Sequence, residues 1–486
     1  MNGQIRKLGI ALLVLYGALF VQLNVVQVLR ADDYNTNPRN NRAVTRDYSR
    51  PRGDIVSFDG TVLATSVPAD GPFERQRTYP PETAELFAHV TGFFSFTSGA
   101  DGVEETYNDE LAGRAEATSV ESFADLLLDN ERQADVRLTI PLAVQQVARD
   151  QLGDRRGSVV AIDPRDGAIL ALWSFPSYDP NGLSSVDQRL AQDTRALLLE
   201  AEGNPLLPKA YRDTYFPGST FKVVTASAAV GAGASLTEPV FPPEREFVPP
   251  QTTQPIRNFG GGTCGGNIVD LLRVSCNTGF AALGVDIGAE AVVETAEAFG
   301  FNSAPPLDLP NVVVSPIGDV ESFRENIPVL AQTALGQNSV RASPLEMALV
   351  AAAIANEGEI MRPHVLSEVR DQDGEVLSRY EPDQWLRAVT PEVARQVRDA
   401  MVVVATEGTA TRLQVAGVST AGKTGTAQIG NGLSHAWIIG FAPADNPRVA
   451  VAVIVEGQQG ASEQTGGRVA APIGQAVLTA ALAATE

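Results

Sequence analysis

The chain has 486 residues, 44% of them hydrophobic, and a formal net charge of −21 at pH 7. This length exceeds what one ordinary hydrophobic core supports, so we expect two or three domains. The acidic balance, without any basic stripe, argues against a nucleic acid partner.

An apolar segment near the N-terminus predicts a membrane anchor. Arg6 and Lys7 precede a run over residues 8–29 that is long enough to cross a bilayer of about 30 Å. The positive charge before the run predicts a cytoplasmic N-terminus and a body outside the cytoplasm. No small-x-small cleavage site follows, so we expect residues 1–30 to remain as an uncleaved anchor. Residues 31–45 are polar and turn-rich and predict a linker.

The region after the anchor mixes strand and helix signals. Residues 54–58 and 61–64 flank Asp59-Gly60, a turn dipeptide that predicts a β-hairpin. Helical patterning follows, for example at residues 120–128. We expect residues 31–150 to form a separate α+β domain.

The remaining chain predicts one antiparallel sheet. Residues 158–162 and 168–173, joined by a turn at 163–167, predict a hairpin, and residues 436–442 and 449–455 predict another. Because these strands come from both ends of the region, we expect the helices between and after them to flank the sheet. The predicted helices cover residues 344–356, 391–405 and 470–483.

Lysine is scarce, and this makes each remaining lysine informative. Only four of the 37 basic residues are lysines. Arginine stays protonated in proteins, whereas a desolvated lysine can lose its proton. Lys222 ends the tetrapeptide Ser219-Thr220-Phe221-Lys222, and Lys423 begins Lys423-Thr424-Gly425.

Ser219 has the surroundings of an activated nucleophile. Pro217 and Gly218 precede it and predict a helix N-terminus, where free N–H groups favour developing negative charge. The spacing of three places Lys222 one helical turn away on the same face. A neutral Lys222 amine could accept the hydroxyl proton, provided that desolvation and a second cation lower its pKa from about 10.4. Lys423 is the candidate for that cation.

Two further segments supply groups suited to a peptide substrate. Ser275 and Asn277, separated by one residue, offer a hydroxyl and an amide. Thr424 and Thr426 offer hydroxyls to a substrate carboxylate, and Gly425 on an expected edge strand would allow a substrate backbone to approach closely.

The cysteines and histidines indicate no metal site. Cys264 and Cys276 are 12 positions apart and are either a disulfide in an exported domain or two inert buried thiols. His89, His364 and His435 are far apart in the sequence. We expect neither a metal nor an organic cofactor.

The three motifs, in the order S-x-x-K, S-x-N and K-T-G, resemble those of the penicillin-recognising serine transpeptidases. Further segments resemble the class B penicillin-binding proteins, and residues 107–113 are similar to the actinobacterial penicillin-binding protein A group. The resemblance covers nearly the whole chain after the anchor. Its additional motifs are Asn41-Arg42, Arg52-Gly53-Asp54-Ile55, Gly102-Val103-Glu104, residues 176–181, Leu335-Gly336-Gln337, Ser343-Pro344-Leu345 and residues 355–358.

The resemblance implies a monofunctional D,D-transpeptidase that cross-links peptidoglycan stem peptides and is acylated by β-lactams. The implied fold class is α+β, with an anchor at residues 1–30, an α+β pedestal at 31–150 and a transpeptidase domain at 151–486. That last domain would hold the antiparallel sheet and an all-helical subdomain. A SEDS-type glycosyltransferase and other wall-synthesis proteins are the implied partners, beside the cytoplasmic membrane.

The resemblance also implies a role for each candidate site residue. The oxyanion hole would use the backbone N–H groups of Ser219 and Thr426. By residue-by-residue transfer, Ser219 is the nucleophile, Lys222 is the acylation base, and Ser275 relays a proton to the leaving amine. Asn277 holds the substrate amide. The site for the substrate carboxylate consists of Lys423, Thr424, Gly425 and Thr426.

Two departures and several alternatives remain at this stage. Ser57-Phe58 and Pro141 replace residues common in the family, and both lie near the pedestal. The alternatives are a D,D-carboxypeptidase or β-lactamase using the same residues, a β-lactam sensor, and a non-catalytic scaffold. The choice between elongation and septation and the identity of the acceptor amino acid stay open.

Overall fold

The computed structural model describes residues 2–30, 48–70, 73–114, 133–430, 432–457 and 465–485. Its contacts divide the chain into two compact units. The first comprises residues 1–51 and 67–76, and the second comprises residues 52–66 and 77–486. The linker predicted at 31–45 and the helix predicted at 120–128 lie outside the described residues.

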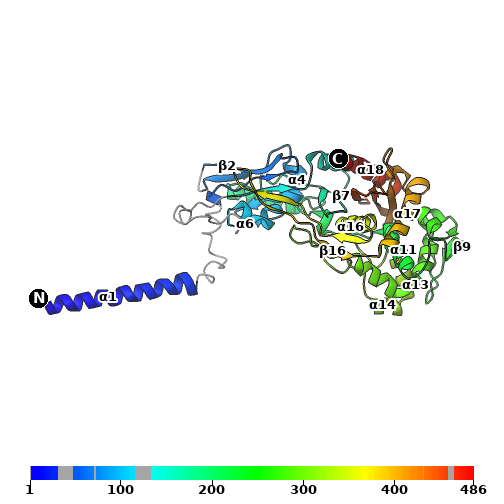
Figure 1. Cartoon of the computed structure of the whole chain (residues 1–486), viewed down its shortest axis with the longest axis horizontal. Coiled ribbons are helices and arrows are strands. Elements are labelled where there is room, and N and C mark those ends of the chain that lie inside the picture. The colour runs from blue at the N-terminus through cyan, green and yellow to red at the C-terminus, as the bar shows by residue number, and fades with distance from the viewer. Residues whose placement is uncertain are drawn as a thin grey trace. The chain divides into compact units, whose positions relative to one another are not determined.

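The first unit begins with one long apolar helix, drawn in blue in Figure 1. Helix α1 spans Asn2–Asn24 and continues as a π-helix over Val25–Leu29. The stretch Gly3–Gln27 contains an 18-residue window with a mean hydropathy of 2.1, and none of that window is buried. The length and composition suffice to cross a membrane, as predicted from the sequence.

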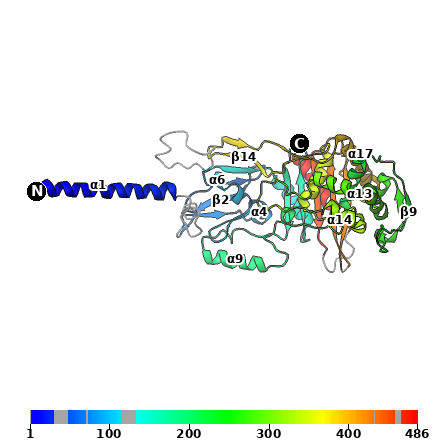
Figure 2. The same ribbon diagram turned by 90° about the horizontal axis from the view of Figure 1, so that it is seen from below.

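A six-stranded sheet combines residues from distant parts of the chain. The predicted hairpin is present as β1 (Ile55–Val56) and β2 (Val62–Pro68), which pair antiparallel. β6 (Asp135–Leu138) runs parallel to β1, and β14 (Leu366–Arg370) pairs with β6. Figure 2 shows β14 in yellow beside the blue and cyan elements. The full order is β15-β14-β6-β1-β2-β3, with β15 at Val376–Arg379 and β3 at Arg75–Thr78.

Beside this sheet lies a buried group of charged side chains. Arg52 Nε lies 2.6 Å from Glu104 Oε2, and Arg77 Nε lies 2.5 Å from Glu104 Oε1. The Tyr79 hydroxyl also donates to Glu104 Oε1, at 3.2 Å. Burial alone would raise the pKa of Glu104, but Arg77 and Arg52 outweigh it and hold that pKa below its ordinary value.

The larger sheet has five antiparallel strands, as the two predicted hairpins require. Its order is β17-β18-β19-β7-β8, so β17 is an edge strand. Every residue of β7 and β19 is buried, which explains their continuous apolar sequences. The bounds are β17 Ala421–Gly430, β18 Leu433–Ala442, β19 Val449–Val455, β7 Gly157–Ile162 and β8 Ile169–Phe175.

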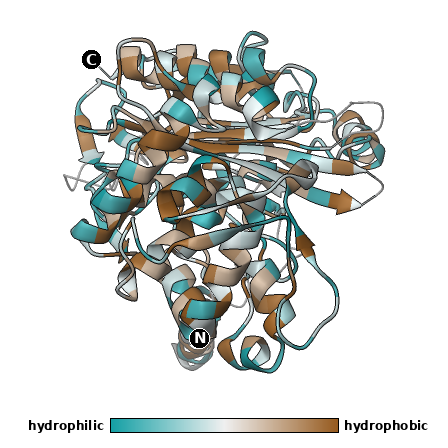
Figure 3. Ribbon diagram, turned by 90° about the vertical axis from the view of Figure 1, so that its right-hand side faces the viewer, coloured by the Kyte–Doolittle hydropathy of each residue, from teal (hydrophilic) through white to brown (hydrophobic). Residues whose placement is uncertain are grey.

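Helices cover both faces of this sheet (Figure 3). α8 (Leu142–Leu152) and α18 (Ala471–Ala484) pack against each other, and α18 contacts β19. α16 (Pro344–Ala355) also contacts β19 and is buried along its whole length. Ser343 caps α16 by accepting a hydrogen bond from the Glu346 N–H at 3.1 Å, and Pro344 occupies its first turn. These signals place the helix where the sequence predicts it.

A largely helical part adjoins the edge strand β17, and the predicted all-helical subdomain corresponds to it. Its helices are α11 (Lys222–Gly231), α12 (Ile268–Arg273), α13 (Asn277–Ala298), α14 (Val320–Glu325), α15 (Ile327–Thr333) and α17 (Pro391–Glu407). Other helices and strands are α4 (Ala84–Thr91), β4 (Phe94–Ser95), β5 (Gly99–Ala100), α5 (Val103–Thr106), α6 (Asn108–Leu111), α9 (Gln188–Glu200), α10 (Lys209–Arg212), β9 (Phe241–Glu244), β10 (Glu246–Phe247), β11 (Ile256–Arg257), β12 (Cys264–Gly266), β13 (Glu359–Met361) and β16 (Gln384–Arg387).

Candidate active site

Ser219 lies in a short 3₁₀-helix, Gly218–Thr220, directly before α11. Gly218 has φ +54°, and a Cβ there would approach the carbonyl of Thr426 to 3.1 Å. Glycine is therefore needed both for the turn and for close contact with β17. The Ser219 hydroxyl makes no hydrogen bond to any described residue and is half-buried at the cavity wall.

Lys222 is fully buried one turn after Ser219. Its Nζ donates to the backbone oxygen of Ser275 at 2.9 Å and to Asn277 Oδ1 at 2.7 Å. Both acceptors are neutral, so the described residues give the Lys222 amine no carboxylate partner. The site thus joins the first and second predicted motifs through one amine.

Ser275 and Asn277 lie at the junction between α12 and α13. Ser275 has φ +58°, which turns the chain sharply before α13 begins at Asn277. Asn277 Nδ2 donates to the backbone oxygen of Arg257 at 2.9 Å. Cys276, between them, is bonded to Cys264 on β12, so the disulfide alternative is the one that the structure contains.

Lys423 on β17 is the second fully buried amine of the site. Its Nζ donates to Ser275 Oγ at 2.9 Å and to the Thr424 carbonyl at 2.8 Å. Thr424 Oγ1 lies 2.6 Å from Thr409 Oγ1. The Ser275 hydroxyl therefore connects the second motif to the third.

Gly425 lies where β17 packs against the segment that holds Ser219. A Cβ on Gly425 would come within 2.9 Å of the Pro217 carbonyl and 3.0 Å of the Thr220 methyl. The glycine thus allows β17 to pack tightly against that segment, and its expected role in letting a substrate backbone approach stays a prediction.

The two amines are electrostatically unusual. Burial, followed by the positive charge of Lys423, holds the pKa of Lys222 well below its ordinary value. Burial also lowers the pKa of Lys423, to about 7. A neutral Lys222 amine can accept a proton near neutral pH, as the sequence analysis required.

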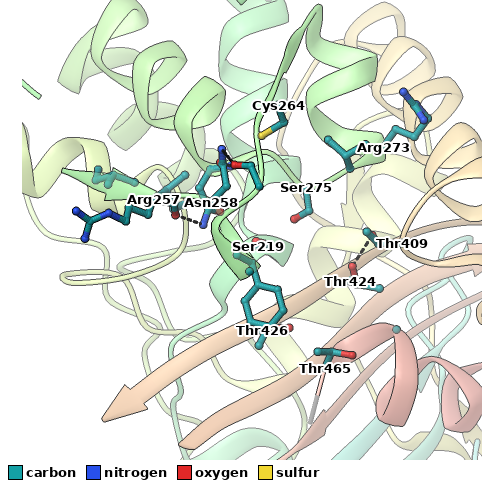
Figure 4. Close-up of a pocket in the computed structure, with 18 of the residues that line it drawn as sticks. Ser219, Arg257, Asn258, Cys264, Arg273, Ser275, Thr409, Thr424, Thr426 and Thr465 are labelled. Atoms are coloured by element: carbon teal, nitrogen blue, oxygen red, sulfur yellow. Dashed lines mark hydrogen bonds between the residues drawn. The ribbon is translucent and has the colours of Figure 1, made fainter. Parts of the chain in front are cut away.

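A cavity of about 1380 Å³ is lined by five of the predicted site residues: Ser219, Ser275, Asn277, Thr424 and Thr426. Figure 4 shows Ser219, Ser275, Thr424 and Thr426 around it. Lys222, Lys423 and Gly425 do not line the cavity and support its wall from behind. All eight predicted site residues are therefore brought together.

Sequence reasoning missed several residues that line the same cavity. Thr409, which contacts Thr424, follows helix α17 and belongs to no short motif that would have indicated it. Four arginines also line the cavity, and no short motif marks them among the many arginines of the chain. The missed arginines are Arg257, Arg273, Arg412 and Arg468. Within the described ranges, no group of three or more metal-ligating side chains occurs.

The fold and the site are those of a class of serine acyltransferases. Residues 157–479 match the model of the penicillin binding protein transpeptidase domain, and residues 52–136 match that of the penicillin binding protein A dimerisation domain. The chain belongs to the penicillin-binding protein transpeptidase family, as its motifs predicted.

Named relatives and solved structures agree with this assignment. The chain is 40% identical to the peptidoglycan D,D-transpeptidase PbpA of Mycolicibacterium smegmatis and 38% identical to that of Mycobacterium tuberculosis, with 99% of each chain covered. It is also similar to penicillin-binding protein A from M. tuberculosis, solved as a ceftriaxone acyl-enzyme complex. That match has a TM-score of 0.83 and 37% identity, and covers 90% of this chain and 100% of the other. The predicted α+β fold class is confirmed.

Proposed function

We propose that the chain is a peptidoglycan D,D-transpeptidase that works through an acyl-enzyme on Ser219. Its family membership and its similarity to a β-lactam acyl-enzyme complex support this activity. The observation that carries the residue assignment is the buried Lys222 amine one turn from Ser219, which has no carboxylate partner among the described residues.

In the first half-reaction, Ser219 Oγ attacks the carbonyl of the penultimate D-Ala of a stem peptide. Lys222 accepts the hydroxyl proton, and the terminal D-Ala leaves as the C–N bond breaks. Ser275, which accepts a hydrogen bond from Lys423 Nζ, passes its proton to the leaving amine and is reprotonated by Lys222, so the Ser219 proton is balanced by the one that D-Ala gains. Release of D-Ala leaves an ester between Ser219 and the donor peptide.

The other site residues position the substrate and stabilise charge. Asn277 holds the substrate amide, and Thr424 and Thr426 offer hydroxyls to the terminal carboxylate, with Lys423 behind them. The backbone N–H groups of Ser219 and Thr426 form the oxyanion hole. The edge position of β17 supports this arrangement because an edge strand leaves half of its backbone groups unpaired.

The proposed function also includes a membrane topology, two domains outside the membrane and protein partners. Helix α1 crosses the cytoplasmic membrane once, with the N-terminus inside and the catalytic domain outside, because Arg6 and Lys7 precede the apolar run. Residues 31–150 form the pedestal and residues 151–486 the transpeptidase domain. A SEDS-type glycosyltransferase and other wall-synthesis proteins are partners on the strength of the family resemblance.

The test is acylation by a fluorescent penicillin, read as intact mass. The full chain in detergent is compared with Ser219→Ala and with Ser378→Ala, which alters an exposed serine on β15. We expect one long-lived adduct on the parent and on Ser378→Ala, and none on Ser219→Ala. Rapid turnover of penicillin would instead indicate a β-lactamase. An unmodified parent would contradict the catalytic assignment and favour a scaffold.

A further inference from the structure

One side of the active-site cavity is basic. Arg273, Arg412 and Arg468 line it together with Thr409 and Thr424. The Thr409 N–H donates to the Arg273 carbonyl at 3.2 Å, and Arg412 Nη1 donates to the Arg468 carbonyl at 3.5 Å. The end of α12, the 3₁₀-helix Thr411–Leu413 and the π-helix Gly466–Ala470 thus each bring one arginine to this wall.

Little negative charge opposes these arginines. Among the described residues that line the cavity, Asp270 is the single carboxylate, and it lies 3.5 Å from Arg273. Arg412 and Arg468 are exposed and form no ion pair with the described part of the chain. In a protein of net charge −21, this local excess of positive charge is suited to an anionic ligand.

The position of the arginines indicates which of the two substrates, the donor peptide or the acceptor amine, they would contact. Under the proposed mechanism, the leaving D-Ala places its carboxylate beside Thr424 and Thr426. The amine that resolves the acyl-enzyme must approach from where the leaving amine departed, because formation and cleavage of the amide are the same step in opposite directions. The wall beside Thr424 therefore faces the acceptor.

We propose that Arg273, Arg412 and Arg468 form an acceptor subsite. It selects an amine whose own carbon bears a free carboxylate, as in a D-amino acid or the distal end of a diamino diacid, over the side-chain amine of lysine. In this step the amine nitrogen bonds to the acyl carbon, the acyl bond to Ser219 Oγ breaks, and one amine proton returns to that oxygen. This inference rests on the proposed transpeptidase function.

One carboxylate would already be served by the threonine hydroxyls and Lys423. Three additional arginines supply more positive charge than the departing D-Ala requires, and arginine pairs well with carboxylates through its planar donors. The acceptor site would therefore attract amines with a negatively charged neighbour, and would do so less strongly at high salt.

The experiment compares two acceptors that differ only in the carboxylate. The full chain in detergent receives an acyl-D-Ala-D-Ala donor with D-methionine or D-methioninamide, and mass spectrometry measures each exchange product. Nα-Acetyl-L-lysinamide serves as the side-chain amine. The double variant Arg412→Gln/Arg468→Gln is compared with Arg257→Gln, which removes a charge from the opposite side of Ser219 and Ser275 in Figure 4.

We expect the parent to favour D-methionine over both other amines by about tenfold or more. The double variant should reduce this preference by about tenfold, and Arg257→Gln should preserve it. Equal use of the acid and the amide by the parent, or an unchanged preference in the double variant, would overturn the proposed subsite. Penicillin acylation is measured alongside. A parent that fails to acylate would refute the transpeptidase itself, whereas acylation without acceptor preference refutes the subsite alone.

Discussion

Two buried groups of charged side chains in this chain are built in opposite ways. Beside the six-stranded sheet, Arg52 and Arg77 share the carboxylate of Glu104, and all three side chains are nearly inaccessible. In the active site, Lys222 and Lys423 are equally buried, but their hydrogen-bond partners are hydroxyl, amide and backbone oxygens.

The difference separates a structural charge from a chemical one. Glu104 and its arginines compensate one another, so their charges are fixed and cannot take part in proton transfer. Among the described residues the lysine amines have no carboxylate partner, and burial lowers their pKa values. A buried lysine without a carboxylate partner is therefore suited to act as a base.

The largest effect expected from this comparison is on acylation. Lys222→Arg keeps the positive charge but cannot provide a neutral amine, so penicillin acylation should slow about 10³-fold. The matched control is Lys209→Arg, because Lys209 is also buried but pairs with Glu456 at 2.7 Å. That variant should acylate within a few-fold of the parent rate. Stopped-flow fluorescence with a labelled penicillin measures both, and similar losses in the two variants would remove the distinction.

The second prediction concerns the compensated group. Glu104→Gln would leave Arg52 and Arg77 buried without their carboxylate, so the free energy of unfolding should fall by roughly 3 kcal/mol. Glu392→Gln removes an exposed carboxylate that lies 3.3 Å from Arg395 and should change that free energy by less than about 1 kcal/mol. Urea titration followed by circular dichroism compares the variants. A Glu104→Gln protein as stable as the parent would show that the three charges do not depend on one another.

The pH dependence of acylation should have two limbs. The acidic limb rises as Lys222 loses its proton. The alkaline limb falls near pH 7, as Lys423, whose pKa is about 7, loses the charge that supports carboxylate binding. In Lys423→Arg the cation persists, so the alkaline limb should disappear, and the ratio of the rate at pH 8 to the rate at pH 6 should exceed the parent's ratio by about tenfold. An alkaline limb that persists in a folded Lys423→Arg variant would assign that limb to another group.

A smaller effect is expected at Glu346, a buried acid that has no hydrogen-bond partner for either oxygen among the described residues. Burial holds its pKa well above the ordinary value, so the native chain keeps a proton that the unfolded chain loses. Stability should therefore fall as pH rises above about 4.5, and Glu346→Met should gain about 1 kcal/mol at pH 7 and less at pH 5. Glu346→Gln, which retains an unpartnered polar group, should gain less. A gain that is independent of pH would contradict the protonated state.

Much of this architecture could be predicted from the sequence, because local signals determine it. The alternating and apolar runs at β7, β8, β18 and β19 predicted hairpins, and the helix predicted at residues 344–356 coincides with α16. The pairing of β14 with β6 was not predictable, since it joins residues more than 200 positions apart without any local signal.

The active site, too, could be predicted only where local sequence signals exist. Ser219, Lys222 and Lys423 could be found because lysine is rare and the motifs are short. The hydrogen-bond acceptors of the two lysine amines could not be predicted, because they depend on the turn at Ser275 and on the bond between Cys264 and Cys276. The sequence left the state of these cysteines open. The basic cavity wall formed by Arg273, Arg412 and Arg468 was not predicted either, because these arginines come from three separate elements and form no motif.

The most direct test of an uncompensated amine pair is a titration of lysine side chains by NMR. The chain contains only four lysines, so selective ¹³Cε labelling gives four assignable resonances, with Lys222→Met and Lys423→Met identifying the two of interest. We predict that the Lys423 resonance titrates near pH 7 and that the Lys222 resonance titrates well below the usual lysine value of about 10.4. If neither resonance titrated below about pH 9, both amines would be ordinary cations, and Lys222 could not act as the base.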